Sequence, residues 1–319
     1  MKNVQSPALF RLIGERVPRP RSSDLLTDDH PLRPYPAVNR VRTSAWMRAL
    51  AFFGVFFVAI LLWTSTIYLT TGIVPLGDIP LAELIGVVIA YPVLTFLMES
   101  RVWPYEIDFQ RLSGLFKGMV LGAVLVSVCI GVLALLGSYS VTGFNGGYSP
   151  WMDLLVIGVC AGVAEEILFR GVLFRLVEEG LGTWGAVLLS ALVFGGLHMN
   201  NPDATLWGAV AIVIEAGILF AAVYVLTRSL WWCIGLHFAW NTMEGPVFGS
   251  IVSGTGAHNS WLVSAWTGPD ILTGGVFGLE ASIVPVILLG ALGICLLVYA
   301  ARKGLMVSPI WSRRALLTK

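Results

Sequence analysis

The stretch Val163-Ala-Glu-Glu-Ile-Leu-Phe-Arg-Gly-Val-Leu-Phe-Arg175 decides how this chain has to fold. It places two adjacent carboxylates, Glu165 and Glu166, and the guanidinium of Arg170 in a segment that is otherwise apolar enough to cross a bilayer. A charge in the middle of a membrane-spanning helix costs about 3 kcal/mol or more, so such charges pair with one another or line a cavity. The stretch therefore predicts a helix of a membrane bundle with a functional site along it.

The composition of the whole chain agrees with a membrane protein. Of 319 residues, 56% are hydrophobic and only 12% are charged, and the mean hydropathy is +0.81. Soluble domains usually carry about a quarter charged residues. We therefore expect an all-α, polytopic transmembrane bundle in a lipid bilayer, the cell membrane. The net charge of +1 gives no reason to expect a nucleic-acid partner.

Apolar runs of spanning length predict about eight helices, near 46–71, 81–98, 115–136, 151–176, 184–198, 206–226, 230–242 and 283–301. Lys and Arg are absent from every second connection, which comprises 72–80, 137–150, 199–205 and 243–282. Because cytoplasmic loops are enriched in Lys and Arg, both termini are predicted to be cytosolic.

The spans divide the chain into four parts. Residues 1–44 are predicted to be a polar, disordered cytosolic tail, and residues 45–145 hold three transmembrane spans. Residues 150–253 form the core that carries the polar motifs. Residues 254–319 comprise an outer loop rich in Gly, Ser and Trp, the last span and a basic cytosolic tail.

The two neighbouring glutamates are predicted to have different roles. They diverge by about 100° around a helix axis, so the two carboxylates cannot share one environment. Glu166 and Arg170 stand at i and i+4 and are expected to form an ion pair that braces the helix. Glu165 is then left to face a cavity. Glu215, in the sixth span, either partners Arg170 or lines that cavity.

Two histidines lie within predicted spans. His198 ends the fifth span just after two glycines, which permit close helix approach. At a rise of about 1.5 Å per residue, Glu165 lies about 22 Å and His198 about 24 Å from the turn at 180–182, so they sit at matching depth on antiparallel helices. On the seventh span, His237 and Asn241 stand at i and i+4 and share one face.

These side chains suit hydrolysis by an activated water. A desolvated glutamate can act as general base near neutral pH while a histidine shares the water, and a second histidine with an amide can hold an oxyanion. Glu165, His198 and His237 would equally suit a catalytic zinc ion with one position open for water. Taken singly, each histidine could simply bridge two helices. The residues by themselves leave these readings open.

Three motifs that follow one another along the chain resemble those of a known family. They are Glu165-Glu166-Ile167-Leu168-Phe169-Arg170-Gly171, Phe194-x-x-x-His198 and His237-x-x-x-Asn241. They are similar to the motifs of the CAAX prenyl protease and bacteriocin-processing family (CPBP, or ABI) of intramembrane endopeptidases. The resemblance covers about residues 151–253.

This resemblance implies a role for each motif residue. Glu165 and His198 would position and activate the water, His237 and Asn241 would stabilise the oxyanion, and Glu166 and Arg170 would support them. It also implies a membrane-associated protein or peptide as substrate, prenylated or lipid-anchored in part of the family, and leaves metal-dependent hydrolysis open.

Two functions of other classes compete with a protease. A non-catalytic scaffold or bacteriocin-immunity-type protein would bind a membrane peptide in the same cavity and would not need an activated water. A proton-coupled transporter would use Glu165, Glu166 and Glu215 as a relay, but the chain contains no internal repeat of the kind that transporters show.

Overall fold

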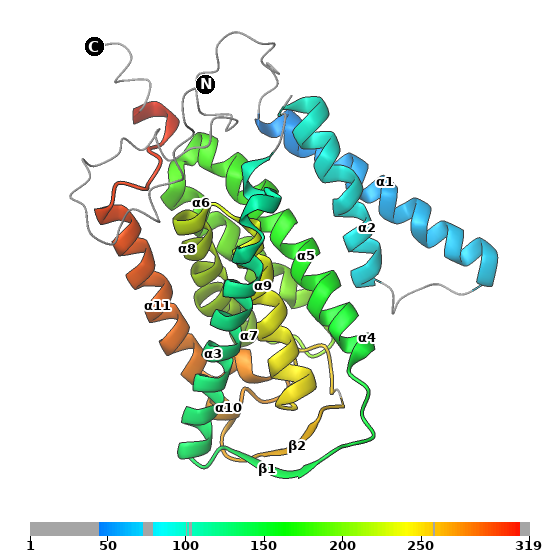
Figure 1. The fold of residues 1–319 in the computed structure, drawn as a ribbon, viewed down its shortest axis with the longest axis vertical. Helices are drawn as coiled ribbons and strands as arrows, with labels where there is room; N and C mark the ends of the chain where they lie inside the picture. The colour runs from blue at the N-terminus through cyan, green and yellow to red at the C-terminus, as the bar shows by residue number, and fades with distance from the viewer. Residues whose placement is uncertain (1–44, 73–78, 100, 102–103, 258, 313–319) are drawn as a thin grey trace.

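The computed structural model describes residues 45–72, 79–99, 101, 104–257 and 259–312, which form a bundle of long helices with a small sheet at one end (Figure 1). The predicted tail at 1–44 lies outside the described residues. The long helical stretches are α1 (Ala45–Thr71), α2 (Ile79–Pro92), α3 (Ser113–Leu135), α6 (Arg175–Leu197), α8 (Ile218–Thr227), α9 (Leu230–Thr242) and α11 (Ile283–Arg302).

Shorter helical pieces extend or join these helices. The π-helical turns η4 (Val93–Met98), η7 (Leu154–Cys160), η8 (Ile167–Phe174), η10 (Val213–Gly217) and η11 (Met243–Val247) are of this kind. The remaining pieces are η5 (Tyr105–Ile107), η6 (Phe109–Arg111), α4 (Trp151–Asp153), α5 (Ala161–Glu166), η9 (His198–Asn200), α7 (Leu206–Ile212), α10 (Asp270–Thr273) and η12 (Leu279–Ala281).

The predicted all-α membrane bundle is confirmed. Five described helical stretches are long and apolar enough to cross a membrane, namely Ala45–Thr71, Ile79–Met98, Phe109–Leu135, Leu206–Thr227 and Ile283–Arg302. The other three predicted spans are also helical, but they are short or carry several charges. The count of eight spans and the cytosolic termini therefore stay predictions.

The outer loops contain a two-stranded sheet that the sequence analysis did not predict. Strand β1 (Tyr139–Phe144) pairs antiparallel with β2 (Leu262–Trp266), with Tyr139 opposite Trp266 and Phe144 opposite Leu262. The Tyr139 and Trp266 rings also meet edge to face, with centroids 4.9 Å apart. The sheet thereby ties the loop after α3 to the long loop that precedes α11.

The chain reverses direction at Gly182, as the expected turn at 180–182 requires. Gly182 has φ 73° and ψ 179°, inside the range assigned to α6. A Cβ at this position would also lie 2.6 Å from the carbonyl oxygen of Val307. Only glycine combines that backbone conformation with so close a neighbour, so this residue sets the antiparallel arrangement of the helices that carry Glu165 and His198.

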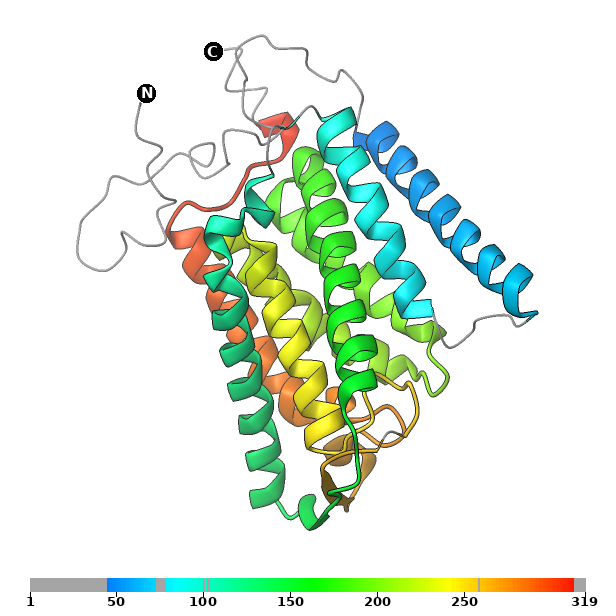
Figure 2. The same cartoon turned by 45° about the vertical axis from the view of Figure 1, so that its right-hand side comes forward.

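Close packing of α3 on α9 determines the position of α9. A Cβ on Gly122 would lie 2.5 Å from the carbonyl oxygen of Leu236, and one on Gly118 would meet the carbonyl oxygen of Trp232. Glycine lets two helix backbones approach in this way. In Figures 1 and 2, α3 and α9 run side by side, while α1 and α2 lie together at one edge of the bundle.

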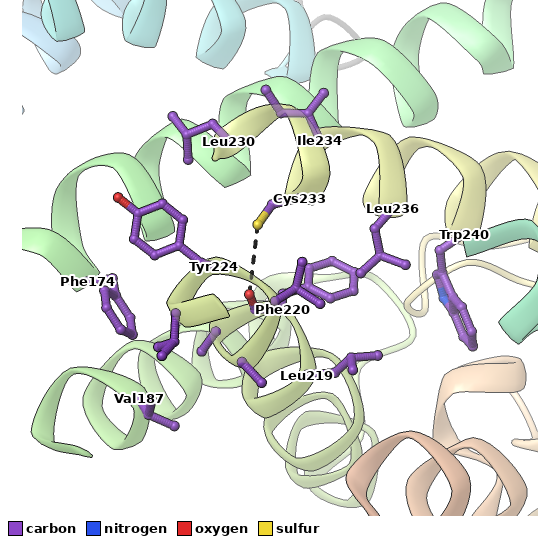
Figure 3. Close-up of a cluster of buried hydrophobic side chains, with 14 of the residues drawn as sticks. Phe174, Val187, Leu219, Phe220, Tyr224, Leu230, Cys233, Ile234, Leu236 and Trp240 are labelled. Atoms are coloured by element: carbon purple, nitrogen blue, oxygen red, sulfur yellow. Dashed lines mark hydrogen bonds between the residues drawn. The ribbon is translucent and has the colours of Figure 1, made fainter. Parts of the chain in front are cut away.

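Part of the hydrophobic core lies between α8 and α9 (Figure 3). Leu219, Phe220 and Tyr224 of α8 face Cys233 and Leu236 of α9, and each of these side chains is at least 95% buried. Burying a large apolar side chain contributes about 1.5–3 kcal/mol. This layer therefore holds α9 against α8, as the glycine contacts hold it against α3.

Candidate active site

The predicted ion pair on the fourth span is present. Arg170 Nη1 donates to Glu166 Oε1 over 2.9 Å, and both side chains are fully buried. The guanidinium also lies over the rings of Phe194, 4.8 Å from the centroid, and Phe220, 5.1 Å away. Such cation–π contacts stabilise a desolvated cation. Arg170 thus braces the helix of the glutamates against the neighbouring helices.

Glu166 has a second partner that the sequence analysis missed. His237 Nδ1 lies 2.9 Å from the same Glu166 Oε1. A carboxylate paired with arginine only accepts hydrogen bonds, so Nδ1 is the nitrogen that carries hydrogen. The other nitrogen, Nε2, is 3.9 Å from Glu165 Oε2. Glu166 therefore orients His237 as well as pairing with Arg170, which makes it more than a brace.

Glu165 is more accessible than Glu166. Its side chain is 24% exposed, and its Oε2 receives no hydrogen bond from a described residue. Glu83 on α2 is close enough for the two carboxylates to repel each other. A glutamate with a free oxygen beside a histidine is placed to take a proton from water.

His198 lies at the end of α6, with its ring held from one side. Its Nδ1 is 2.8 Å from the carbonyl oxygen of Phe194. Because a carbonyl only accepts, Nδ1 donates and the neutral ring keeps its lone pair on Nε2. The Phe194 ring packs against His198 at a centroid distance of 4.8 Å and against His237 at 6.2 Å. Phe194 thereby links the two histidines.

A small cavity brings together three of the four residues with predicted catalytic roles, His198, His237 and Asn241. It leaves about 10 Å³ for the centre of a water molecule, enough for about one water. It is lined by Phe194, His198, Glu215, Ala216, Phe220, His237, Trp240, Asn241, Ser253 and Glu280. Of the two alternatives for Glu215, the structure supports lining the cavity. Glu165 borders His237 and is not among these lining residues.

The side-chain amide of Asn241 is held by a hydrogen bond from one of its two N–H groups. Its Nδ2 donates to the carbonyl oxygen of Ile157 over 2.9 Å, and the residue is 5% exposed. An amide nitrogen carries two hydrogens, so one remains to bind an oxyanion beside His237.

The geometry leaves the zinc alternative a prediction. Among the described residues, no three His, Cys, Asp or Glu side chains converge as a metal site. Nδ1 of His237 bonds to Glu166 and Nδ1 of His198 bonds to the carbonyl oxygen of Phe194, which leaves both Nε2 nitrogens without a hydrogen-bond partner in the part of the chain that the structure describes. This is the usual arrangement of histidines that bind a metal ion through Nε2. Metal-dependent and metal-free hydrolysis therefore both stay predictions.

Sequence reasoning missed two hydroxyl- or carboxyl-bearing residues of the cavity, Ser253 and Glu280. Both belong to the outer loop between α9 and α11. The only signal for Glu280 was a single acid in an otherwise apolar, glycine-rich approach to the last span. Nothing in the local pattern showed that this loop folds back to the histidines.

Comparisons with known proteins point to the same part of the chain. Residues 147–243 match the family model described as type II CAAX prenyl endopeptidase Rce1-like. An 89-residue stretch is 29% identical to "Putative membrane peptidase YdiL" of Bacillus subtilis (strain 168). That match covers 28% of this chain and 34% of the relative. The resemblance drawn from the three motifs is thus confirmed for the region that contains them.

Proposed function

We propose that this chain, which carries an Rce1-like region across residues 147–243, is an intramembrane endopeptidase that hydrolyses a peptide bond of a membrane-associated protein. One observation carries the proposal. One small cavity is lined by His198, His237 and Asn241, and Glu165 lies 3.9 Å from His237. A water-activating pair and two oxyanion donors are the parts that acyl transfer to water needs.

Water activation is assigned to Glu165 and His198. The carboxylate of Glu165 takes one proton of the attacking water, and Nε2 of His198 accepts a hydrogen bond from the other. Positioning water between two acceptors leaves its lone pair directed at the carbonyl carbon. General-base assistance of this kind contributes about 10²–10⁴-fold in rate.

Oxyanion binding is assigned to His237 and Asn241. When Nδ1 of His237 donates to Glu166, Nε2 can donate as well only in the imidazolium form. The carboxylates of Glu165 and Glu166 balance that positive charge. Asn241 adds its second N–H. The loss of one oxyanion donor typically costs about 10²–10³-fold in kcat.

The substrate class follows from the setting of the site and from the comparisons. The site lies in an apolar bundle, a setting that suits a substrate which is itself held at the membrane. The matched family is described as a CAAX prenyl endopeptidase, which makes prenylated or otherwise lipid-anchored proteins the first class to test.

The test compares membrane fractions of cells that carry the wild-type protein, Glu165→Gln, His198→Ala or the control Asp270→Asn. Asp270 is an exposed acid of the outer loop, so its substitution removes a carboxylate outside the site. We expect one or more membrane-protein precursors to accumulate with the first two variants and not with the control.

Two outcomes contradict the proposal. Normal processing by Glu165→Gln would remove the basis for the assigned chemistry. A partner that binds the wild type and every variant equally, with no cleavage of any of them, would indicate the non-catalytic binding protein instead.

A further inference from the structure

The cavity is also lined by acidic residues that the proposed mechanism does not use. Glu215 of η10 and Glu280 of η12 line it together with the two histidines, and they are 1% and 4% exposed. Glu244 of η11 is fully buried and interacts electrostatically with both. Three carboxyl groups so close and so buried cannot all be charged. They therefore share at least one proton.

Glu280 is the member of this group that the protein holds most firmly. Ser253 Oγ donates to Glu280 Oε2 over 2.5 Å, and Trp240 Nε1 donates to Oε1 over 3.2 Å. Ser253 is itself held, because Asn201 Nδ2 donates to its carbonyl oxygen over 2.6 Å. The carboxyl group of Glu280 is thus presented to the cavity from a loop anchored on two sides.

Glu215 supplies an independent sign that the cavity takes a polar occupant. Its Oε1 is buried and receives no hydrogen bond from any described residue. A buried oxygen without a partner is costly, and such groups are usually satisfied by an ordered water. The cavity has room for about one water, and its lining offers that water Glu215, Glu280 and the histidines as partners.

The chemistry of the proposed reaction needs a second proton carrier. Hydrolysis of a peptide bond to a carboxylate and an ammonium group forms one C–O bond, breaks the C–N bond and moves both water protons to the amine nitrogen. Glu165 can carry one proton at a time. The second proton leaves the new hydroxyl group through Nε2 of His198 and has to be held until the amine can accept it.

We propose that Glu280 is a positioning residue that holds this second proton, exchanging it with His198 through a water in the cavity. The proton returns by the same route to the amine, so Glu280 ends each turnover as it began. The groups that face Glu280 are Glu215, Glu244, His198 and His237. The inference rests on the proposed function, since it assigns a step of the same reaction.

The test uses the full-length protein in proteoliposomes and, as probe, the purified precursor that accumulates with Glu165→Gln. Glu280→Gln keeps the size of the side chain and an acceptor for Trp240 but removes the proton site. We expect kcat to fall about tenfold or more, less than the 10²–10⁴-fold of a direct general acid or base, with KM unchanged.

A second variant separates proton transfer from mere support. Ser253→Ala removes a donor that stabilises the ionised carboxylate, which raises the pKa of Glu280. The acid limb of the kcat profile should therefore move to higher pH in Ser253→Ala. The same substitution made in the Glu280→Gln background should produce no shift, because the titrating group is gone.

The outcomes are distinct. The inference is overturned if Glu280→Gln has the kcat and pH profile of the wild type, or if the acid limb does not move in Ser253→Ala. In either case the proposed function still stands as long as Glu165→Gln is inactive. A limb that moves equally with and without Glu280 also overturns it. If Glu280→Gln does not fold, Ser253→Ala alone decides. An active Glu165→Gln refutes the proposed function itself.

Discussion

The contact between α3 and α9 makes a sharp prediction about activity, because α9 carries His237 and Asn241. Gly122→Ala would place a Cβ 2.5 Å from the carbonyl oxygen of Leu236, where ordinary contact begins at 3.4 Å. The helices would have to separate locally by the difference, 0.9 Å. The displaced carbonyl belongs to the residue directly before His237, so the imidazole has to move with it.

The magnitude follows from that displacement. A misplacement of about 1 Å in a catalytic group can cost about 10²-fold in rate, which corresponds to about 2.7 kcal/mol of transition-state stabilisation. Overpacking of this kind also lowers the free energy of unfolding by about 1–3 kcal/mol. Both effects are expected in Gly122→Ala, and the loss should appear in kcat rather than in KM.

The matched control is Gly131→Ala, the same substitution on the same helix. A Cβ on Gly131 meets nothing within 4 Å, so α9 stays where it is. The assay measures cleavage of the accumulating precursor per mole of folded protein in proteoliposomes, together with thermal unfolding in detergent. If Gly122→Ala has the specific activity of Gly131→Ala, the position of His237 does not depend on the α3–α9 approach and the reasoning is wrong.

Three further predictions concern the buried charges and the metal question. Glu166→Gln leaves Arg170 buried without its counter-charge and should lower the free energy of unfolding by about 3–5 kcal/mol. The double variant that combines Glu166→Leu with Arg170→Met should recover much of that stability in thermal unfolding, but it should not recover activity. Burial alone would raise the pKa of Glu106, but Arg101 and Arg175 hold that pKa well below its ordinary value. The stability gained from Glu106 is therefore complete above the ordinary glutamate pKa and is lost as pH falls toward the lowered one, so acid unfolding should be shallower in Glu106→Gln than in the wild type. Because the proposed chemistry uses only side chains of this chain, extensive dialysis against a chelator should leave cleavage unchanged. Loss of activity that zinc restores would support the metal scheme.

Much of the fold could be predicted because it depends on local properties. Hydropathy located the helical segments to within a few residues, since an apolar run long enough to cross a bilayer has few alternatives to a helix. The pair of Glu166 and Arg170 was also predictable, because i and i+4 positions meet on any helix. The turn at Gly182 could be located from the glycines that interrupt the apolar pattern.

The sheet could not be predicted in the same way. Its strands, β1 and β2, are separated by more than a hundred residues, and each lies in a loop with weak alternation. What pairs them is the return of the long outer loop to the end of α3. That return depends on the packing of the whole bundle.

The candidate site was predicted as a set of residues but not as a geometry. Glu165, His198, His237 and Asn241 could be selected because polar groups are few and costly inside an apolar bundle. The motif spacing could not show that Glu166 Oε1 serves Arg170 and His237 at once. Nor could it show that Glu280 reaches the same cavity from the outer loop.

The sequence by itself determined that Val163 to Arg175 is a buried helix with one paired and one freer carboxylate, since helix periodicity and the cost of burying charge act within a single segment. Only the tertiary structure decided what those carboxylates meet. His237 lies 71 residues after Glu166 in the chain, and the two side chains are hydrogen-bonded. The position of His237 is set by the packing of α9 on the glycines of α3 and on the apolar side chains of α8. Hydrogen bonds between distant segments depend on where the helices pack, and that packing is a property of the whole bundle.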